Sequence, residues 1–267
     1  MLLIMGADKL MASNEATKQV RSPLRYPGGK ARAISCIVQY IPRSETLCAP
    51  FLGGGSVELA CTSRMKVYGS DIFKPLATFW KILLKDAEEL ARCVECYYPL
   101  SKDRFYALQK SLVSMSGIEQ AAAFFVLNRA SFSGTTLSGG MSPGHPRFTW
   151  SAIERLRRFK VGNFSVSCSD YKTAIRRHGD AFLYLDPPYM TGQALYGVGG
   201  NTHKGFDHAA LAEFISKRDR WILSYNDCPE IRELYKSSHI MSVKWKYGMS
   251  NNKNSNEILI ASEKLSK

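Results

Sequence analysis

Long apolar runs are missing from this chain of 267 residues. No stretch approaches the roughly 18 unbroken apolar residues that a membrane-spanning helix needs. The segment from Met1 to Gly6 is apolar, but it lacks a basic leader and a long apolar core, so we do not predict a secretory signal there. We expect a globular protein that acts in the cytoplasm and does not associate with membranes.

Paired cysteines are also scarce. The chain has seven cysteines, an odd and scattered set, and Cys93 and Cys96 form its only CxxC pair. A structural zinc site needs four ligands, and no second pair stands at a suitable spacing. We therefore predict reduced thiols and no metal, with Cys93 and Cys96 filling space within a helix.

Acidic residues are outnumbered, since the formal net charge is +13. The surplus of basic residues is concentrated between Arg147 and Arg177. This segment contains eight Lys and Arg residues but only two acidic residues, Glu154 and Asp170. A basic surface of this size attracts polyanions, most commonly nucleic acid, with anionic membrane as the second possibility. The simpler alternative is a solvated basic face on a helix over 152–159.

Internal repeats and low-complexity runs are absent, and the chain instead alternates strands with helices at both ends. This rhythm predicts an α/β fold with a mostly parallel sheet and helices on both faces. The expected strands are 46–49, 66–68, 164–168, 181–185, 221–224, 239–245 and 256–261, and the expected helices are 30–41, 56–61 and 76–84.

The alternation stops between about 90 and 160, where helical segments surround a Gly/Ser-rich stretch from Ser131 to Gly144. Such an insertion in an α/β protein is usually functional or disordered. We predict a tail over 1–20, a catalytic domain made of 21–90 and 161–267, and a mainly helical substrate-recognition insertion over 91–160.

A glycine cluster, Pro50-Phe-Leu-Gly-Gly-Gly-Ser56, stands between an expected strand and an expected helix. Glycines allow a tight turn and a close backbone approach to a cofactor. Asp71 ends the next strand, where a carboxylate can accept hydrogen bonds from ribose hydroxyls; it could also cap the helix that follows. A nicotinamide-binding GxGxxG loop is not matched, because Glu58 occupies the third glycine position.

The tetrapeptide Asp186-Pro-Pro-Tyr189 follows the apolar strand 181–185 and is a more specific signal. A carboxylate at a strand end can accept a hydrogen bond from an amino group and so direct its lone pair toward an electrophilic methyl group. Pro187 and Pro188 fix the backbone and offer no competing donors. Tyr189 offers a flat face on which an extruded base can stack. The alternative is a rigid surface turn.

Together these motifs resemble the Dam-type, alpha-group adenine DNA methyltransferases, which use S-adenosylmethionine. The resemblance extends from about residue 21 to 262. It is carried by Arg25-Tyr-Pro-Gly-Gly-Lys30, Pro50 to Glu58, Ser70-Asp71, Leu127 to Gly134, Asp186 to Tyr189, Leu223 to Asp227 and Asn256 to Ile260. It implies a Rossmann-like methyltransferase fold. It also implies that the insertion recognises the DNA target.

The resemblance further implies residue roles. Tyr26 and Lys30 would lie against the methyl donor, as suits a sulfonium cation and a carboxylate. Phe51, Gly53 and Gly55 would lie under its methionine and ribose, and Asp71 would bind the ribose. Asp170 and Tyr171 would contact its adenine, a looser assignment. Asp186 would hold the target amino group and Tyr189 would stack on the flipped adenine. Ala49 departs from the family, which often has an acid there.

The DNA-binding residues implied by the resemblance are Arg129, Ser131, Phe132, Ser133 and Arg147. Arginine can read guanine or grip phosphate, and phenylalanine can wedge between base steps. The alternative places Phe132 in the core and makes Arg129 a helix C-cap. The target sequence does not follow from these residues.

The expected reaction is direct methyl transfer to N6 of a flipped-out adenine in double-stranded DNA, with S-adenosylhomocysteine as the product and no metal. A cytosine-N4, RNA or protein amino methyltransferase on the same scaffold is one alternative, and a non-catalytic DNA-binding relative is another. A cognate restriction endonuclease, as in restriction–modification systems, is a possible partner.

Overall fold

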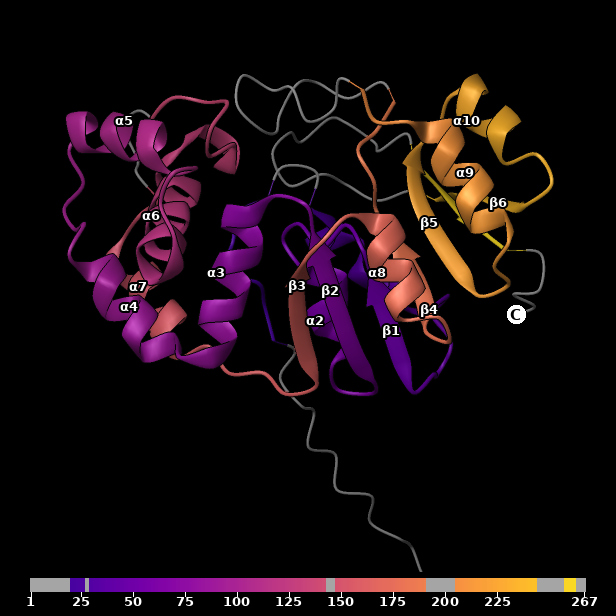
Figure 1. The fold of residues 1–267 in the computed structure, drawn as a ribbon, viewed down its shortest axis with the longest axis horizontal. Helices are drawn as coiled ribbons and strands as arrows, with labels where there is room; N and C mark the ends of the chain where they lie inside the picture. Colours follow the sequence, from indigo (N-terminus) through magenta and orange to yellow (C-terminus); the bar gives the residue numbers. More distant parts are fainter. Residues whose placement is uncertain (1–19, 27–28, 143–146, 191–204, 244–256, 263–267) are drawn as a thin grey trace, which may run out of the picture.

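The structure, a computed structural model, describes residues 20–26, 29–142, 147–190, 205–243 and 257–262 (Figure 1). The predicted tail over 1–20 lies almost wholly outside these residues. So do positions 244–245 and 256 of the two last expected strands.

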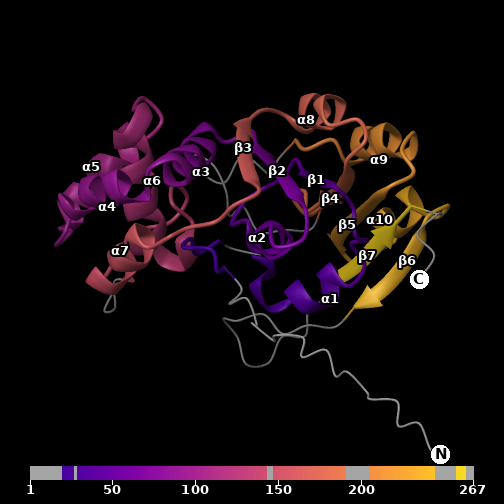
Figure 2. The ribbon, with the colours of Figure 1, turned by 90° about the horizontal axis from the view of Figure 1, so that it is seen from below.

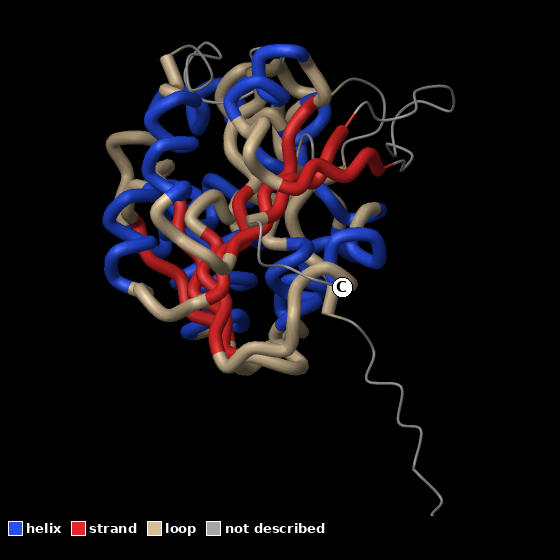
Figure 3. Tube along the Cα trace, turned by 90° about the vertical axis from the view of Figure 1, so that its right-hand side faces the viewer, coloured by secondary structure: helices blue, strands red, loops and turns tan. Residues whose placement is uncertain are grey.

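A seven-stranded sheet with the order β3-β2-β1-β4-β5-β7-β6 forms the centre of the molecule. Strands β1 to β5 are parallel to one another, and β7 runs antiparallel between β5 and β6. The strands are β1 (Thr46–Ala49), β2 (Lys66–Asp71), β3 (Phe164–Cys168), β4 (Phe182–Leu185), β5 (Trp221–Asn226), β6 (His239–Val243) and β7 (Glu257–Ala261). Figure 3 shows the sheet twisting through the molecule from edge to edge.

Apolar side chains cover both faces of the sheet, which is why its central strands are apolar throughout. In β4, Phe182 and Tyr184 pack on one face, whereas Leu183 and Leu185 pack on the other. The first face is covered by η1 (Lys30–Arg32), α1 (Ile34–Val38) and α2 (Ser56–Cys61), and the second by α8 (Tyr171–Arg177), α9 (His208–Ser216) and α10 (Pro229–Leu234). Figure 2 shows α1 and α8 on opposite sides of the sheet.

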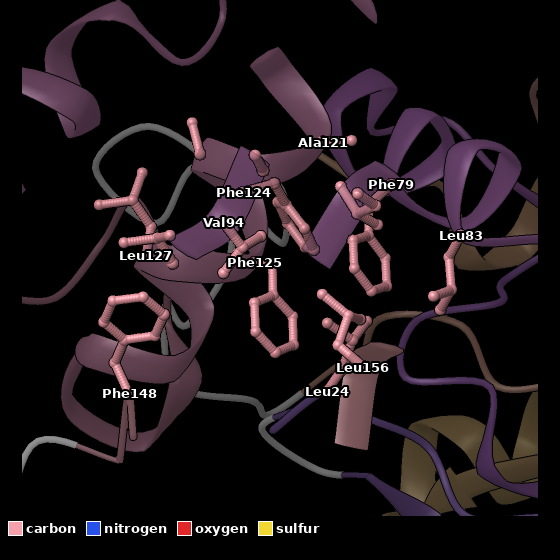
Figure 4. Packing of buried hydrophobic residues seen from close by; sticks show 14 of the residues in the cluster. Leu24, Phe79, Leu83, Val94, Ala121, Phe124, Phe125, Leu127, Phe148 and Leu156 are labelled. Atoms are coloured by element: carbon pink, nitrogen blue, oxygen red, sulfur yellow. The ribbon is translucent and has the colours of Figure 1, made fainter. Parts of the chain in front are cut away.

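A group of helices extends from the β3 edge of the sheet (Figures 1 and 2). It comprises α4 (Ala87–Glu95), α5 (Lys102–Ser111), α6 (Gly117–Ala130) and α7 (Trp150–Arg157), and it packs on α3 (Lys74–Lys85). Its core contains Phe79 of α3, Phe124 and Phe125 of α6, and Leu156 of α7 (Figure 4). Because α6 is buried nearly all round, it anchors the other helices to the catalytic sheet.

The expected alternation of strands and helices is confirmed, and 46–49, 56–61 and 164–168 match in both bounds. Several expected bounds differ from those of the structure. The expected helix 30–41 is split into η1 and α1, and the expected boundary at 91 falls inside α4. The expected helix 152–159 begins earlier, at Trp150, because Thr149 caps it through a hydrogen bond from the Ala152 N–H (3.3 Å).

Within the described residues, no helix is both long and apolar enough to cross a lipid bilayer.

Candidate active site

The candidate site lies where the order of the strands reverses. From β1 the chain continues to β2 and β3 on one side, then returns to form β4 and β5 on the other. The carboxyl ends of β1 and β4 are neighbours at this point, the place where open α/β sheets bind ligands. The glycine loop follows β1 and Asp186 follows β4, so the topology brings the two predicted motifs together.

The glycine loop adopts a conformation that depends on its glycines. Gly53 and Gly55 have φ values of +47° and +65°, which side chains other than glycine rarely adopt. The ring of Tyr26 packs on this loop so closely that a Cβ on Gly53 would lie 2.9 Å from a ring carbon. The Trp80 indole N–H donates to the Gly53 carbonyl (3.1 Å). Tyr26 and Trp80 therefore fix the shape of the loop from two sides.

Asp71 holds the same loop through its carboxylate. Oδ2 accepts a hydrogen bond from the Gly53 N–H (3.1 Å), and Oδ1 accepts one from the Phe73 N–H (2.9 Å). Burial raises the pKa of Asp71, although these backbone donors oppose the shift. The alternative that Asp71 caps α3 is wrong, because Phe73 is the N-cap residue of that helix. The sequence therefore located Asp71 in the site but did not reveal that it supports the loop.

The Asp186 carboxylate is held at one of its two oxygens. Oδ1 lies 2.9 Å from Lys30 Nζ and accepts hydrogen bonds from the hydroxyls of Ser224 (2.7 Å) and Tyr189 (3.4 Å). Burial, followed by the charges of Asp186 and Glu257, raises the pKa of Tyr189 well above its usual value, so its hydroxyl stays a donor. Across the described residues these contacts all fall on Oδ1, which leaves Oδ2 able to accept from a ligand.

Lys30 sits in a buried group of charges rather than at the surface. Its Nζ lies 3.8 Å from Glu257 Oε2, in addition to its contact with Asp186. Burial lowers the pKa of Lys30, but Asp186, Glu257 and Glu58 together raise it above its ordinary value. Lys30 is thus a buried, charged ammonium beside the Asp186 carboxylate.

Glu58 is buried in the same group, at the first turn of α2. Burial raises its pKa to about 8, and Asp186 adds to the rise, while backbone N–H groups and Lys30 oppose it. Glu257 is buried as well, and burial with Asp186 raises its pKa to about 7 against the influence of Lys30. The site therefore gathers buried carboxyl groups whose pKa values are strongly raised, a feature typical of functional sites.

Glu58 makes the fold sensitive to alkaline pH. Its pKa is raised on folding, so the stability associated with the neutral acid is present below about pH 4.5 and is lost as the pH rises through about 8. A glutamine at this position cannot ionise, so Glu58→Gln should not lose stability as the pH rises. The stability that wild type loses is at most roughly 5 kcal/mol. Chemical unfolding near pH 5 and pH 9 should show the variant gaining stability over wild type only at the higher pH. An equal gain at both pH values would contradict the buried acid.

Three aromatic rings gather beside the glycine loop. Phe51 stacks on Tyr171 with ring centroids 5.6 Å apart, and Phe206 meets the edge of Phe51 at 5.7 Å. Asp170, placed next to Tyr171, caps α8 by accepting from the Thr173 N–H (3.0 Å). Phe51 and Tyr171, which were both predicted to contact the donor, are therefore adjacent, whereas the Asp170 carboxylate accepts from the first turn of α8.

The predicted DNA-binding residues lie at the end of α6 and beyond it. Phe132 is 64% exposed, so the alternative that it belongs to the core is wrong. Arg129 donates to the Arg147 carbonyl (3.1 Å) instead of capping α6, whose C-cap is Ser131. The pKa of Arg129 is lowered to about 10 by burial and by Arg155, Arg25 and Arg147, which shows that four arginines converge here.

Two of the sequence expectations for this region need correction. Ser131 is buried, and its hydroxyl accepts from the Thr136 N–H (3.0 Å), so it shapes the loop rather than facing outward. Ser133 does lie on the same turn, with a φ of +55°. Arg157, counted in the basic stretch, is engaged by Glu88, Glu95 and Glu154 and ties α7 to α4. Arg155 and Arg158 remain exposed on this surface.

Four members of the site were not assigned from the sequence: Glu58, Phe206, Ser224 and Glu257. Ser224 and Glu257 belong to the motifs Leu223 to Asp227 and Asn256 to Ile260. Only the register of the sheet places these two side chains near Asp186. Glu58 ends the motif from Pro50 to Glu58 and occupies the third glycine position of a GxGxxG loop, but the sequence assigns it no role in the site. Within the described residues no group of three or more His, Cys, Asp or Glu side chains is arranged to hold a metal ion.

A mostly parallel sheet with one antiparallel strand inserted next to its edge, a glycine loop after β1 and Asp-Pro-Pro-Tyr after β4 define a Rossmann-like methyltransferase. The comparison with known families makes this class specific. The chain belongs to the family of D12 class N6 adenine-specific DNA methyltransferases, which it matches over residues 26–249.

Individual relatives agree with the family. The chain is 27% identical to the DNA adenine methylase of Vibrio cholerae over 256 residues, covering 88% of this chain and 92% of that protein. It is 26% identical to the DNA adenine methylase of Escherichia coli K12, covering 88% and 91%. It is 24% identical to the DNA N-6-adenine-methyltransferase of Escherichia phage P1, covering 82% of this chain but 31% of that longer protein.

The fold class and the enzyme class expected from the sequence are therefore confirmed: the chain is an adenine-N6 DNA methyltransferase. Membership of this class also implies the use of S-adenosylmethionine.

Proposed function

We propose that the protein transfers a methyl group from S-adenosylmethionine to N6 of an adenine that has been flipped out of a specific site in double-stranded DNA. The observation that carries this proposal is the Asp186 carboxylate. Its Oδ1 is fixed by Lys30, Ser224 and Tyr189, and its Oδ2 is left to accept from an amino group. The glycine loop, where a methyl donor would bind, is beside it at the neighbouring strand end.

The residues around the loop suit the proposed donor. Tyr26 and Phe51 provide aromatic surface for a sulfonium compound, and the left-handed Gly53 and Gly55 let the backbone approach it closely. Asp71 keeps the loop in this shape, and Tyr171 with Phe206 offers a stacking surface for an adenine ring. When bound, S-adenosylmethionine supplies an electrophilic methyl group and is converted to S-adenosylhomocysteine.

Asp186 orients the target amine. By accepting an N–H of N6 at Oδ2, it draws the nitrogen lone pair out of conjugation with the purine ring and toward the donor side of the site. Pro187 and Pro188 have no N–H groups, so they do not compete for that carboxylate and they keep the backbone rigid. Most of the acceleration then comes from positioning and from the fixed polar surroundings.

Tyr189 supports the flipped base. Its ring lies 6.0 Å from that of Tyr225 and 4.9 Å from Lys30 Nζ, contacts that keep it in place before a base arrives. Extrusion of a base costs a few kcal/mol, and stacking, worth roughly 1–3 kcal/mol, offsets part of that cost.

Replacement of Tyr189 should therefore affect turnover more than binding. We expect Tyr189→Ala to lower kcat about 30-fold, because the ring acts only after extrusion, while duplex affinity changes less than about threefold. Tyr189→Phe is the matched control: it keeps the stacking ring and loses the hydroxyl, which donates the long hydrogen bond to Asp186 and also interacts with Glu257, so most activity should remain. Steady-state kinetics and DNA titration distinguish the two effects. A loss confined to duplex affinity would exclude the stacking role.

DNA would approach across the end of α6. The converging Arg25, Arg129, Arg147 and Arg155 suit a phosphate backbone, and the exposed ring of Phe132 is placed to contact bases. Ser133 lies on the same turn and can contribute a hydroxyl. We infer from these residues a DNA-binding role for the helical insertion, and with DNA as the substrate we place the protein in the cytoplasm at the nucleoid. A cognate endonuclease stays a prediction from the family.

Mass analysis of nucleosides tests the proposed function. Unmethylated DNA incubated with the protein and S-adenosylmethionine should yield N6-methyladenosine as the deoxynucleoside, and S-adenosylhomocysteine in equal amount. Parallel reactions with RNA and with adenine-free duplex should give none. N4-methylcytosine as the sole product, or methylation of RNA alone, would replace this proposal with one of the alternatives. Binding of DNA without donor binding in calorimetry would indicate a non-catalytic relative.

A further inference from the structure

Glu257 reaches the site because its strand runs against the others. Strand β7 is antiparallel to β5, so its first residue, Glu257, pairs with Asn226, the last residue of β5. The beginning of β7 therefore lies at the same sheet edge as the carboxyl ends of β4 and β5. This places a carboxylate that is only 4% exposed next to the catalytic motif.

Lys30 connects Glu257 to Asp186. Its Nζ is 2.9 Å from Asp186 Oδ1 and 3.8 Å from Glu257 Oε2, and the side chains of Lys30 and Glu257 are 4% and 2% exposed. Lys30 has four rotatable bonds, and a single partner would allow its ammonium to swing. A second carboxylate within ion-pair distance restricts that motion.

Stability alone gives a poor account of Glu257. Buried ion pairs are often no better for folding than apolar residues of similar volume, and here the neighbours in β7 are Ile258, Leu259 and Ile260, all fully buried. The buried group contains three carboxylates, Glu58, Asp186 and Glu257, around one lysine. Burial opposes the ionisation of Glu257 and raises its pKa to about 7, so a charged carboxylate here is costly for folding, and its place 3.8 Å from Lys30 Nζ is better explained by a role in the reaction.

We propose that Glu257 is a positioning residue for methyl transfer, which acts through Lys30. The Glu257 carboxylate holds the Lys30 ammonium, Lys30 holds Asp186 Oδ1, and Asp186 Oδ2 is thereby aimed at the N6 amino group. This inference rests on the proposed function, because it assigns to Glu257 the task of orienting the residue that binds the adenine. It adds a residue that touches neither the base nor the methyl donor.

The ionisation of Glu257 should appear in the pH dependence. The charged and titratable groups around it are Lys30 from η1, Asp186 and Tyr189 after β4, Tyr184 of β4 and, across Lys30, Glu58 of α2. Burial raises the pKa of Glu257 to about 7, so its negative charge is present above that pH and is lost below it. If the charge holds Lys30, kcat should rise as the pH increases through about 7.

The test compares Glu257→Gln with Glu58→Gln, measuring kcat and the KM values for donor and DNA from about pH 6 to pH 9. Glu58 is the matched control because it is equally buried in the same charge group but forms no ion pair with Lys30 among the described contacts. Glu257→Gln should lower kcat about tenfold at pH 8, with both KM values within about threefold of wild type and without the rise near pH 7. Glu58→Gln should keep that rise.

A double-mutant cycle tests the route through Lys30. In a Lys30→Met background, measured in single turnovers, Glu257→Gln should have no further effect on the rate. Glu257→Asp keeps the negative charge, but its side chain is one methylene group shorter, so the carboxylate lies farther from Lys30. This variant should have a lower kcat, and its kcat should still rise with pH near 7.

Four results would overturn the proposal. They are a wild-type kcat and pH profile in Glu257→Gln, a full loss that repeats in the Lys30→Met background, a loss expressed only in the donor KM, and unfolding of both Glu257 variants by circular dichroism. Failure of the proposed function looks different, because wild-type protein would then produce no N6-methyladenine at all.

Discussion

Asp186→Ala should reduce methylation of DNA at least about 1,000-fold, equivalent to about 4 kcal/mol of transition-state stabilisation. The substitution removes the only acceptor that we assign to the target amino group. It also removes the shorter of the two ion pairs of Lys30 within the described residues and keeps the one with Glu257, at 3.8 Å. The effect should fall on kcat, and radiolabelled methyl transfer under single-turnover conditions would measure it.

The fold should survive this change. Asp186 is 23% exposed at its side chain and lies in the segment after β4 rather than in the apolar core. Thermal unfolding and donor affinity should therefore stay close to wild type. Asp186→Asn is a second variant of the same shape. Its amide can still accept from N6, but its NH₂ group would oppose Lys30, so we expect a loss intermediate between wild type and Asp186→Ala. Near-normal turnover in Asp186→Ala would refute the assigned role.

Asp71→Ala should weaken binding of S-adenosylmethionine about 100-fold. It removes two hydrogen bonds to a charged acceptor, each worth roughly 1.5–3 kcal/mol, that hold the Gly53 and Phe73 amides. The glycine loop would then lose its shape on the side where Asp71 supports it. Isothermal titration calorimetry with the donor measures this directly.

The prediction for Asp71 is specific because the substitution affects the affinity for the donor and not kcat. At saturating donor, kcat of Asp71→Ala should remain within about threefold of wild type, because Asp71 contacts the loop and not Asp186. Asp71→Asn can still accept one of the two N–H groups and should lose only about tenfold in affinity. An unchanged donor affinity in Asp71→Ala would show that Tyr26 and Trp80 hold the loop without it.

The sequence predicted the parts of the fold that depend on local patterns. Short apolar runs such as 181–185 favour strands buried on both faces, and the glycines at 53 and 55 mark a turn that has positive φ in the structure. The two motifs could be placed together because carboxyl ends of parallel strands share an edge. The resemblance to Dam-type enzymes added the chemistry, and the comparisons confirmed the family.

The remainder depended on the register and packing of distant segments. Glu257 reaches Lys30 only because β7 is antiparallel to β5, which no local pattern reveals. The expected contact of Lys30 with the donor stays a prediction, and the structure adds that its Nζ lies 2.9 Å from Asp186 Oδ1, a contact that no local pattern indicates. Ser131 had been expected at the DNA surface, but the loop turns its hydroxyl inward to Thr136. In each case side-chain direction, set by tertiary contacts, decided the role.

A crystal structure with S-adenosylhomocysteine bound tests the central claim most directly, namely that the glycine loop and Asp186 belong to one site. The ligand should lie against Tyr26 and Phe51, with its sulfur directed toward Asp186 and with Lys30 still in contact with Oδ1. A ligand bound away from the loop between Phe51 and Gly55, or with its sulfur turned from Asp186, would contradict the account.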